Sequence, residues 1–446
     1  MTKRLIVAGG CAAGMSAAAK AKRTDPNLEV VVYERSSFIS YAACGMPYLI
    51  AGDIVDHHGL ILRTPEQMAK QGVEVHIHHQ AMAIDPQAQT LAVRDLKAER
   101  ELIIGYDKLV IATGARPVRP SLPGSDLEGI FALRSLESGL AVQRFLADKT
   151  PRRAVIVGGG YIGVEMAETF RRLGLEVTMI IRSGKVMRTT LDDDLRSLVH
   201  AELAHQGVEI IQGTPLAFEP NGRLKAIVTK TGHYPCDLAL LAIGPCPNTE
   251  LADAAGVTLG PTGAIATDAT MGTNLPGVYA AGDCAEAFHL VSGRPAYIPL
   301  GSTANKQGRV AGENAGGRKA TFGGVVGTMV VRCFELTVAS TGLSATQARA
   351  AGFDVRETKI QAKDISHYFP GAADIHVKLV VEAESDRLLG GQILGTSGVA
   401  KRIDVLATAL YNRMTVAEVR ELDLSYAPPF APVWDPILVA ANVAAK

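Results

Sequence analysis

The sequence predicts an α/β protein in which two similar βαβ units are followed by a separate α+β domain. A strand at Arg4–Ala8, a glycine-rich turn with a helix at Gly9–Arg23 and a second strand at Leu28–Tyr33 form the first unit. The same order of strand, turn with helix, and strand returns between Ala154 and Ile181. The pattern changes after Phe322, where strands and helices no longer alternate in this way.

Composition limits the classes of protein that this chain can represent. The 446 residues allow about three domains. They carry 45 basic and 45 acidic side chains, so no nucleic acid and no anionic membrane is expected as a partner. No apolar run reaches the length of a membrane span, and no leader segment is expected before the first strand. Six scattered cysteines without a CxxC pair predict neither disulfides nor a metal site, and a cytoplasmic location is expected.

Further strands and helices are expected between and after the two units. Val73–Val93 alternates like a β meander, while Tyr106–Ala115 and Gly277–Ala281 are expected to be buried strands. Gly312–Lys319 is the expected linker to the last domain. That domain is expected to contain strands at Val325–Val331 and Ile375–Val381 and a helix at Lys401–Asn412. The predicted domains are residues 1–115 with 247–320, residues 116–246, and residues 321–446.

The first turn, Gly9–Gly14, reads GGCAAG and predicts a dinucleotide site. Cys11 stands where the GxGxxG pattern has its middle glycine, so the match is imperfect. Glu34 closes the second strand twenty residues after Gly14, where a carboxylate accepts both hydrogen bonds of an adenosine ribose. The turn offers backbone N–H groups and a helix N-terminus to a pyrophosphate. The alternative is a tight structural turn with a surface glutamate.

The second turn, Gly158–Gly163, reads GGGYIG and has all three glycines. Its second strand ends at Ile181 without a carboxylate, and the cations Arg182, Lys185 and Arg188 follow. A guanidinium binds the 2′-phosphate that a carboxylate would repel. This unit is therefore expected to bind a nicotinamide nucleotide and to favour, or at least permit, NADPH. The alternative is that these cations form an exposed, solvated face.

Two further segments, ATG at Ala112–Gly114 and GVYAAGD at Gly277–Asp283, complete a set of four motifs. In this order they resemble the pyridine nucleotide-disulfide oxidoreductases over most of the chain. The resemblance implies a glutathione-reductase-like fold of two Rossmann-like domains and a dimerisation domain, with FAD bound by the first domain and NAD(P)H by the second. The residues expected to bind these cofactors are Gly9, Gly10, Ala13, Gly14, Glu34, Arg35, Ala112, Thr113, Gly114, Gly158, Gly160, Tyr161, Ile162, Gly163, Glu165, Arg182, Gly244, Gly282, Asp283 and Ala304.

The segment Ser40–Tyr48 reads SYAACGMPY and contains one cysteine, Cys44. Disulfide reductases of the glutathione type have a partner cysteine five residues away, where this chain has Ile39. The segment resembles the single-cysteine branch of the family, which includes coenzyme A disulfide reductases, persulfide and polysulfide reductases, and NADH oxidases and peroxidases. We expect a helix N-terminus and a nearby flavin to lower the pKa of Cys44 and to hold a reactive thiolate. The alternative is a buried, inert thiol.

The C-terminal end resembles the coenzyme A disulfide reductases through SYAPPF at Ser425–Phe430 and WDP at Trp434–Pro436. Tyr368 and Tyr426 match the two active-site tyrosines of that group, and a phenol can protonate a departing thiolate. In that group a tyrosine of one subunit reaches the cysteine of the other, so a homodimer is expected. The alternative is that these are amphipathic interface tyrosines.

Coenzyme A recognition is implied by the same resemblance. Cations suit the phosphates of this ligand. Ala43 stands where the group usually has asparagine, which leaves the preferred acceptor open. The positions that match ligand contacts of the group are Ser16, Lys20, Arg23, Ser40, Asn305 and Arg309.

The sequence therefore predicts an FAD-dependent NAD(P)H oxidoreductase that reduces coenzyme A disulfide, coenzyme A persulfide or polysulfide. Coenzyme A would be the substrate or a mixed disulfide on Cys44, and Cys44, Tyr368 and Tyr426 are the expected catalytic residues. One alternative is an NADH oxidase or peroxidase that uses a sulfenic acid on Cys44, although Cys11 and Ala12 stand where a peroxidase is expected to carry a histidine. Another is a redox-sensing flavoprotein with little turnover.

Overall fold

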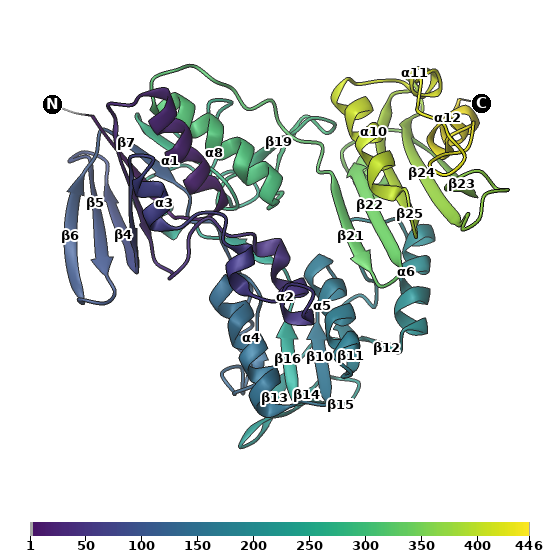
Figure 1. Cartoon of the computed structure of the whole chain (residues 1–446), viewed down its shortest axis with the longest axis horizontal. Coiled ribbons are helices and arrows are strands. Elements are labelled where there is room, and N and C mark those ends of the chain that lie inside the picture. Colours follow the sequence, from purple (N-terminus) through teal and green to yellow (C-terminus); the bar gives the residue numbers. More distant parts are fainter. Residues whose placement is uncertain (1–2, 446) are drawn as a thin grey trace.

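The computed structural model describes residues 3–445, so the outermost residues of the predicted first and last domains, Met1, Thr2 and Lys446, lie outside the described residues. Figure 1 shows three lobes, with the N-terminal lobe on the left, a second lobe below it and the C-terminal lobe on the right. Helix α2 (Met46–Ala51) lies where the first and second lobes meet. None of the helices in residues 3–445 combines the length and apolar character that crossing a lipid bilayer needs.

A five-stranded parallel sheet forms the centre of the first lobe. Leu5, Ile6 and Val7 of its middle strand are fully buried, as expected for a strand covered on both faces. Strands that follow the middle strand in the chain lie on both of its sides, so the strand order reverses there. The carboxyl end of such a strand is where open α/β sheets bind their ligands. In spatial order the strands are β18 (Val278–Ala280), β7 (Lys108–Ile111), β1 (Arg4–Ala8), β2 (Glu29–Glu34) and β3 (Val73–Ile77).

Helices α1 (Ala12–Thr24) and α8 (Gly301–Ala315) pack against each other beside this sheet. Gly308 and Gly312 of α8 permit the close approach, because a Cβ at either position would collide with a backbone carbonyl of α1. The predicted linker at Gly312–Lys319 was therefore placed too early. Its first residues belong to α8. There Gly312 allows α8 to approach α1 closely and does not make the chain flexible.

An antiparallel sheet lies outside the parallel one in the first lobe. It consists of β4 (His79–Asp85), β5 (Thr90–Asp95) and β6 (Arg100–Gly105). The meander predicted for Val73–Val93 was partly wrong, because Val73–Ile77 pairs in parallel with β2. Alternation of polar and apolar residues marks a strand that is exposed on one face, and an edge strand of a parallel sheet shares that pattern.

The second lobe repeats the parallel arrangement around β10. Its strands are, in spatial order, β12 (Val208–Gln212), β11 (Glu176–Ile181), β10 (Arg153–Val157), β16 (Leu238–Leu241) and β9 (Ile130–Phe131). Its helices are α4 (Leu136–Lys149), α5 (Tyr161–Arg172) and α6 (Asp193–His205), and a small antiparallel sheet contains β13 (Ala217–Asn221), β14 (Arg223–Val228) and β15 (His233–Pro235). Two short antiparallel strands, β8 (Ala115–Pro117) and β17 (Pro245–Pro247), connect this lobe to the first.

The third lobe is an antiparallel sheet covered by helices. Its central strand β25 is buried along its whole length. The strand order is β21 (Met329–Cys333), β22 (Leu336–Gly342), β25 (Leu388–Gly395), β24 (Asp374–Glu382) and β23 (Val355–Lys363), and the helices are α9 (Ala345–Ala350), α10 (Val399–Tyr411), α11 (Val416–Arg420) and α12 (Pro436–Ala444). The predicted fold class, two parallel α/β units followed by an α+β unit, is confirmed.

The remaining elements are short. They include the 3₁₀ turn η1 and helix α2, which follow the first βαβ unit. In chain order they are η1 (Ala43–Gly45), α2 (Met46–Ala51), η2 (His57–Leu60), α3 (Pro65–Ala69), α7 (Glu250–Ala254), β19 (Ala287–His289) and β20 (Arg294–Ala296).

Replacing Gly312 with alanine tests the contact between α1 and α8. The added Cβ would collide with the carbonyl oxygen of Ala17, and overpacking of this kind costs about 1–3 kcal/mol, so thermal unfolding should occur at a lower temperature. Gly301→Ala is the matched control, because nothing lies within 4 Å of its added Cβ on the same helix. Equal melting temperatures for the two variants would contradict the close approach.

Candidate active site

The first glycine turn has the shape of a dinucleotide cradle. A Cβ at Gly9 would collide with the carbonyl oxygen of Ala112, and one at Gly14 with that of Gly9, so the turn presses directly on its neighbouring strand. Helix α1 has no side-chain N-cap and no acidic residue in its first turn, which leaves N–H groups for an anion. The Glu34 carboxylate accepts hydrogen bonds from the Gly10 N–H at 2.6 Å and the Ser36 N–H at 2.8 Å. These residues fit FAD.

Residues from three other segments close this cradle. Gly282 faces Ala13, and a Cβ on Gly282 would lie 2.7 Å from that of Ala13 and 3.6 Å from that of Ala304. Asp283 follows directly, and Arg134 of the second lobe donates to its carboxylate at 2.6 Å. The predicted FAD residues Gly9, Ala13, Gly14, Ala112, Gly282 and Ala304 thus come together, while Arg35 is exposed.

The crossover between the lobes contains Thr113 and Gly114. The Thr113 hydroxyl donates to the carbonyl oxygen of Asn248 at 2.7 Å, and the Asn248 amide donates back to the carbonyl of Thr113 at 2.8 Å. Gly244 lies on the same connection, where its carbonyl accepts from the Val118 N–H at 3.0 Å. These hydrogen bonds hold the two chain crossovers between the lobes side by side.

The second turn is more open than the first. Gly158 and Gly163 make the same close approaches to backbone carbonyls, but nothing lies within 4 Å of a Cβ on Gly160, and α5 also lacks a side-chain cap. Tyr161 and Ile162 are exposed at the start of α5. A phosphate can therefore approach the backbone N–H groups here.

The basic corner beside this turn is only partly available to a ligand. Arg182 and Arg188 are exposed, but Lys185 pairs with Asp193 at 2.8 Å. Thr190 donates a hydrogen bond of 3.0 Å to the Tyr161 hydroxyl. The loop that contains Thr190 therefore contacts Tyr161, which lies within the second glycine turn.

Cys44 is the only exposed cysteine among the six. It lies in η1, immediately before α2. Helix α2 packs between α4 and α5: the Met46 sulfur would lie 3.1 Å from a Cβ on Gly139, and the Thr169 hydroxyl donates to the Pro47 carbonyl at 3.2 Å. Arg172 adds a bidentate pair with Asp53, at 2.7 and 2.6 Å. The helix after the thiol is therefore bound to the helix that begins at the second glycine turn.

The acidity of Cys44 differs from the sequence-based expectation. Although the residue is partly exposed, desolvation of its thiol by the surrounding protein raises the pKa of Cys44, and the nearby Glu165 and Asp283 carboxylates raise it further, whereas Arg134 lowers it. The protein's own groups thus raise this pKa, opposite to the direction expected from the sequence, and the lowering by a bound flavin stays a prediction. Helix α2 has only six residues, and two carboxylates distant in sequence act on the same thiol. Burial also raises the pKa of Glu165 to about 7, with a contribution from Glu168.

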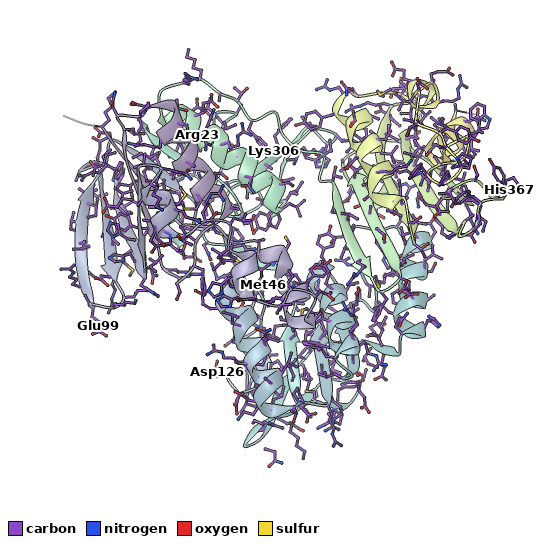
Figure 2. The ribbon with its side chains drawn as sticks, viewed as in Figure 1. Arg23, Met46, Glu99, Asp126, Lys306 and His367 are labelled. Atoms are coloured by element: carbon purple, nitrogen blue, oxygen red, sulfur yellow. The ribbon has the colours of Figure 1, made fainter. Side chains whose placement is uncertain are left out.

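The two candidate tyrosines meet on the third lobe. Their hydroxyl oxygens lie 3.5 Å apart, both side chains are exposed, and the hydrogen bond lowers the pKa of Tyr368 and raises that of Tyr426. Figure 2 shows His367, next to Tyr368, at the outer edge of the third lobe and Met46, close to Cys44, near the centre of the molecule. A single chain therefore does not bring the tyrosines to its own Cys44.

The residues expected to bind coenzyme A lie on α1, on α8 and beside the cysteine loop. Ser16 donates to the Asn305 side chain at 2.7 Å, so these two positions are adjacent. Lys20 pairs with Glu313 at 3.0 Å, while Arg23 and Arg309 are exposed. Arg23 is labelled on the first lobe in Figure 2. Ser40 has φ of 46° in the loop that leads to Cys44.

Sequence reasoning missed Arg134, Glu168 and Arg332. Arg332 of β21 pairs with Glu168 of α5 at 2.6 Å, and its guanidinium lies 5.3 Å from the centre of the Tyr48 ring. Arg332, Glu168 and Tyr48 line a small cavity next to α2 together with Glu165. No motif includes Arg134 or Arg332, and only the three-dimensional fold brings them to the site.

Comparison with known families identifies the class of this protein. Residues 3–308 match the pyridine nucleotide-disulphide oxidoreductases, and residues 329–436 match the dimerisation domain of that family. The chain belongs to the pyridine nucleotide-disulphide oxidoreductase family. It is an oxidoreductase that uses FAD and NAD(P)H, as its family does.

Individual relatives carry several names. The chain is 39% identical to an NAD(P)H coenzyme A polysulfide/persulfide reductase of Pyrococcus horikoshii, over 99% of this chain and 98% of that one. It is 28% identical to a coenzyme A disulfide reductase of Staphylococcus haemolyticus, over 96% of each chain. An NADH oxidase of Methanocaldococcus jannaschii is 31% identical over 99% of each chain. A solved NAD-dependent persulfide reductase from A. fulgidus has a TM-score of 0.96 at 37% identity, covering 99% of this chain and 83% of that one.

The raised pKa of Glu165 predicts a pH-dependent gain in stability for Glu165→Gln. Because the folded-state pKa lies above the ordinary value of 4.5, the carboxylate destabilises the fold as pH rises from 4.5 through about 7. The variant should match wild type near pH 4.5 and gain up to about 3 kcal/mol at pH 8, measured by denaturant unfolding at both pH values.

Glu250→Gln is the control, because Arg116 pairs with this exposed glutamate at 2.6 Å. It should show no gain at pH 8. An equal effect of Glu165→Gln at both pH values would show that Glu165 does not titrate in this range.

Proposed function

We propose that the chain is an FAD-dependent NAD(P)H oxidoreductase that reduces coenzyme A persulfide, coenzyme A disulfide or polysulfide through Cys44. The observation that carries the proposal is the position of this thiol. It is the only exposed cysteine, and the helix that follows it is clamped to α5, which begins at the second glycine turn. The names of the relatives support the same class of acceptor.

The proposed chemistry begins with the Cys44 thiolate. It attacks one sulfur of coenzyme A disulfide, the S–S bond breaks, and one coenzyme A leaves as a thiolate that takes up a proton. The other remains on Cys44 as a mixed disulfide. A hydride equivalent from NAD(P)H then breaks this bond, so that the second coenzyme A leaves as a thiol and Cys44 returns to the thiolate. FAD supplies the two-electron transfer between the nucleotide and sulfur.

The binding roles are part of the proposal. The FAD site would lie in residues 1–115 and 247–320, the NAD(P)H site in residues 116–246, and the dimer contacts in residues 321–446. Glu34 and Asp283 would bind the ribose and the ribityl chain of FAD, and Arg182 a 2′-phosphate. Exposed Arg23 and Arg309 would bind phosphates of coenzyme A, with Ser16, Lys20, Ser40 and Asn305 beside them.

The working unit is proposed to be a homodimer in the cytoplasm. The tyrosine pair is exposed and distant from Cys44 of the same chain, which supports a site completed by a second subunit. Exposed Phe430, Val433 and Trp434 lie near Tyr426 in sequence and would form part of the contact. A phenol there would protonate the departing coenzyme A thiolate.

An NADH oxidase is the second candidate function. It is favoured by the relative of that name, which also aligns over nearly the whole chain. In that reaction Cys44 would cycle through a sulfenic acid, with oxygen or peroxide as the acceptor. A redox-sensing flavoprotein would instead show slow reduction by either nucleotide.

Cys44→Ser should abolish turnover with sulfur acceptors. NADPH and NADH oxidation are followed anaerobically with coenzyme A disulfide, coenzyme A persulfide or polysulfide, and then with oxygen alone. Wild type should reduce sulfur acceptors faster than oxygen, and the serine variant should lose at least about 100-fold in rate, because serine cannot form the mixed disulfide. Cys246→Ser is the control and should keep full activity. Faster turnover with oxygen would favour the oxidase instead.

Hybrid dimers test whether the site spans two subunits. Cys44→Ser and Tyr426→Phe subunits, each of low activity alone, are mixed after reversible dissociation. Random pairing makes about half of the dimers hybrids with one intact site of two, so about a quarter of wild-type activity should return. No recovery on mixing would place the tyrosine and the cysteine of one site in the same chain.

A further inference from the structure

The loop between β11 and α6, residues 182–192, lies directly against the second glycine turn. The Met187 N–H donates to the Gly159 carbonyl at 2.6 Å. Thr190 donates to the Tyr161 hydroxyl at 3.0 Å. Arg182, the proposed partner of a 2′-phosphate, begins the same loop. The position of this loop therefore affects several groups of the nucleotide site.

The third lobe holds the end of this loop through Asp192. The side chain is 7% exposed and lies at the N-terminus of α6. Its N–H donates to the Gln392 side chain at 3.0 Å, and its carboxylate accepts from the Gln392 amide at 2.7 Å and the Ala345 N–H at 3.1 Å. Gln392 is on β25 and Ala345 begins α9, so a residue of the second lobe is satisfied by partners in the third.

A buried ammonium completes this anchor. Lys378 of β24 is 3% exposed and lies 3.3 Å from the Asp192 carboxylate, 2.8 Å from that of Asp194 and 2.6 Å from that of Glu357. Buried charges are tolerated only when they are paired and hydrogen-bonded, and removing one partner is costly. The Asp192–Lys378–Gln392 anchor is therefore sensitive to small changes.

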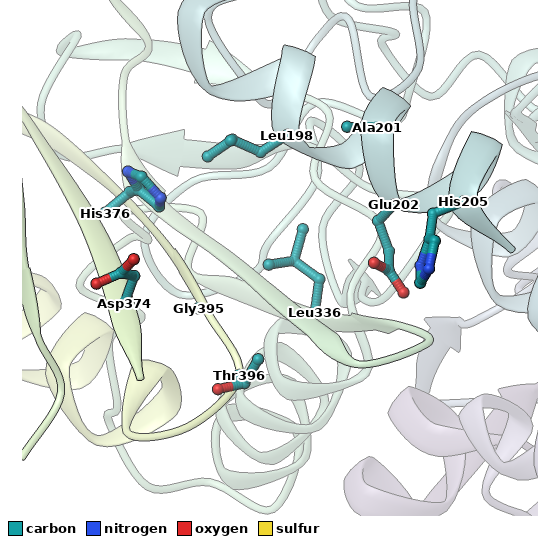
Figure 3. Close-up of a pocket in the computed structure, with 9 residues that line it drawn as sticks. All are labelled: Leu198, Ala201, Glu202, His205, Leu336, Asp374, His376, Gly395 and Thr396. Atoms are coloured by element: carbon teal, nitrogen blue, oxygen red, sulfur yellow. The ribbon is translucent and has the colours of Figure 1, made fainter. Parts of the chain in front are cut away.

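The other end of α6 is packed less tightly against the same sheet. A cavity of about 310 Å³ separates Glu202 and His205 of α6 from Asp374 and His376 of β24, as Figure 3 shows. The interface between the second and third lobes is called the seam below. It is held by ion pairs where the loop meets α6, and it contains a cavity at the other end of that helix.

We propose that the Asp192–Lys378–Gln392 anchor makes the third lobe set the affinity of the second turn for NAD(P)H. These are positioning residues, because they act through residues 182–192 on Tyr161 and Arg182 and do not touch the nucleotide. The inference rests on the proposed function only in assigning a nicotinamide nucleotide to this turn.

Asp192→Asn in the FAD-loaded enzyme tests this inference. NADP⁺, which binds without reacting, is titrated calorimetrically, and NADPH-dependent ferricyanide reduction gives KM and kcat. We expect about tenfold weaker NADP⁺ binding, about 1.4 kcal/mol, and a similar rise in KM, with kcat within about twofold of wild type, because the neutral amide loses the charge that pairs with Lys378 and holds the loop. Asp192→Asn with Gln392→Glu restores a carboxylate and an amide across the seam and should recover most of the affinity.

Asp374→Asn is the matched control, since it makes the same change at the open end of the same seam. Wild-type affinity in Asp192→Asn overturns the inference, and so does an equal loss in Asp374→Asn. If Asp192→Asn is not recovered folded, Gln392→Met decides the matter, because it keeps the length of the side chain and removes both hydrogen bonds to Asp192: unchanged affinity overturns the proposal. These readouts need no sulfur acceptor, so failure with coenzyme A compounds leaves them intact.

Discussion

The clamp on helix α2 is the constraint on which the active site depends. The thiol is fixed by the helix that follows it, and this helix is bonded to α5 through Thr169 and Arg172 and packed on α4 at Gly139. Helix α5 starts at the second glycine turn, so one packing contact relates the thiol to the nucleotide cradle. Without that contact, two correctly formed nucleotide units would have no defined relation to the sulfur chemistry.

Sequence patterns were sufficient to predict those features that depend on residues close together in the chain. A glycine turn needs residues without a side chain at fixed spacing, and Gly9, Gly14, Gly158 and Gly163 all make the close approaches that their motifs predict. Alternation could not distinguish the edge strand at Val73–Ile77 from a meander, because both expose one face. Helical glycines were read as a linker because sequence alone does not show which helix will press against them.

The site was predictable only in part, for a related reason. Motifs predict Cys44, Tyr368 and Tyr426 as catalytic residues, and the fold brings the two tyrosines together. The pKa of Cys44 could not be predicted, because Glu165 and Asp283 reach the thiol from different lobes. No motif surrounds three of the charged residues, Arg134, Arg332 and Lys378. Each forms ion pairs with residues that are far away in the sequence, so the sequence alone does not indicate its role. Arg332 and Lys378 of the third lobe thus contact the second lobe, at Glu168 and at Asp192 and Asp194, in ways that local sequence does not encode.

The intact mass of the protein after reaction with coenzyme A disulfide tests the central claim most directly. Enzyme with a free Cys44 thiol and oxidised FAD is treated anaerobically with the disulfide, and its mass is measured before and after one equivalent of NADPH. The account predicts one added coenzyme A per chain, mapped to the peptide that contains Cys44 and removed by NADPH. An unchanged mass, or an adduct on another cysteine that NADPH does not remove, would contradict a cycle carried by Cys44 alone.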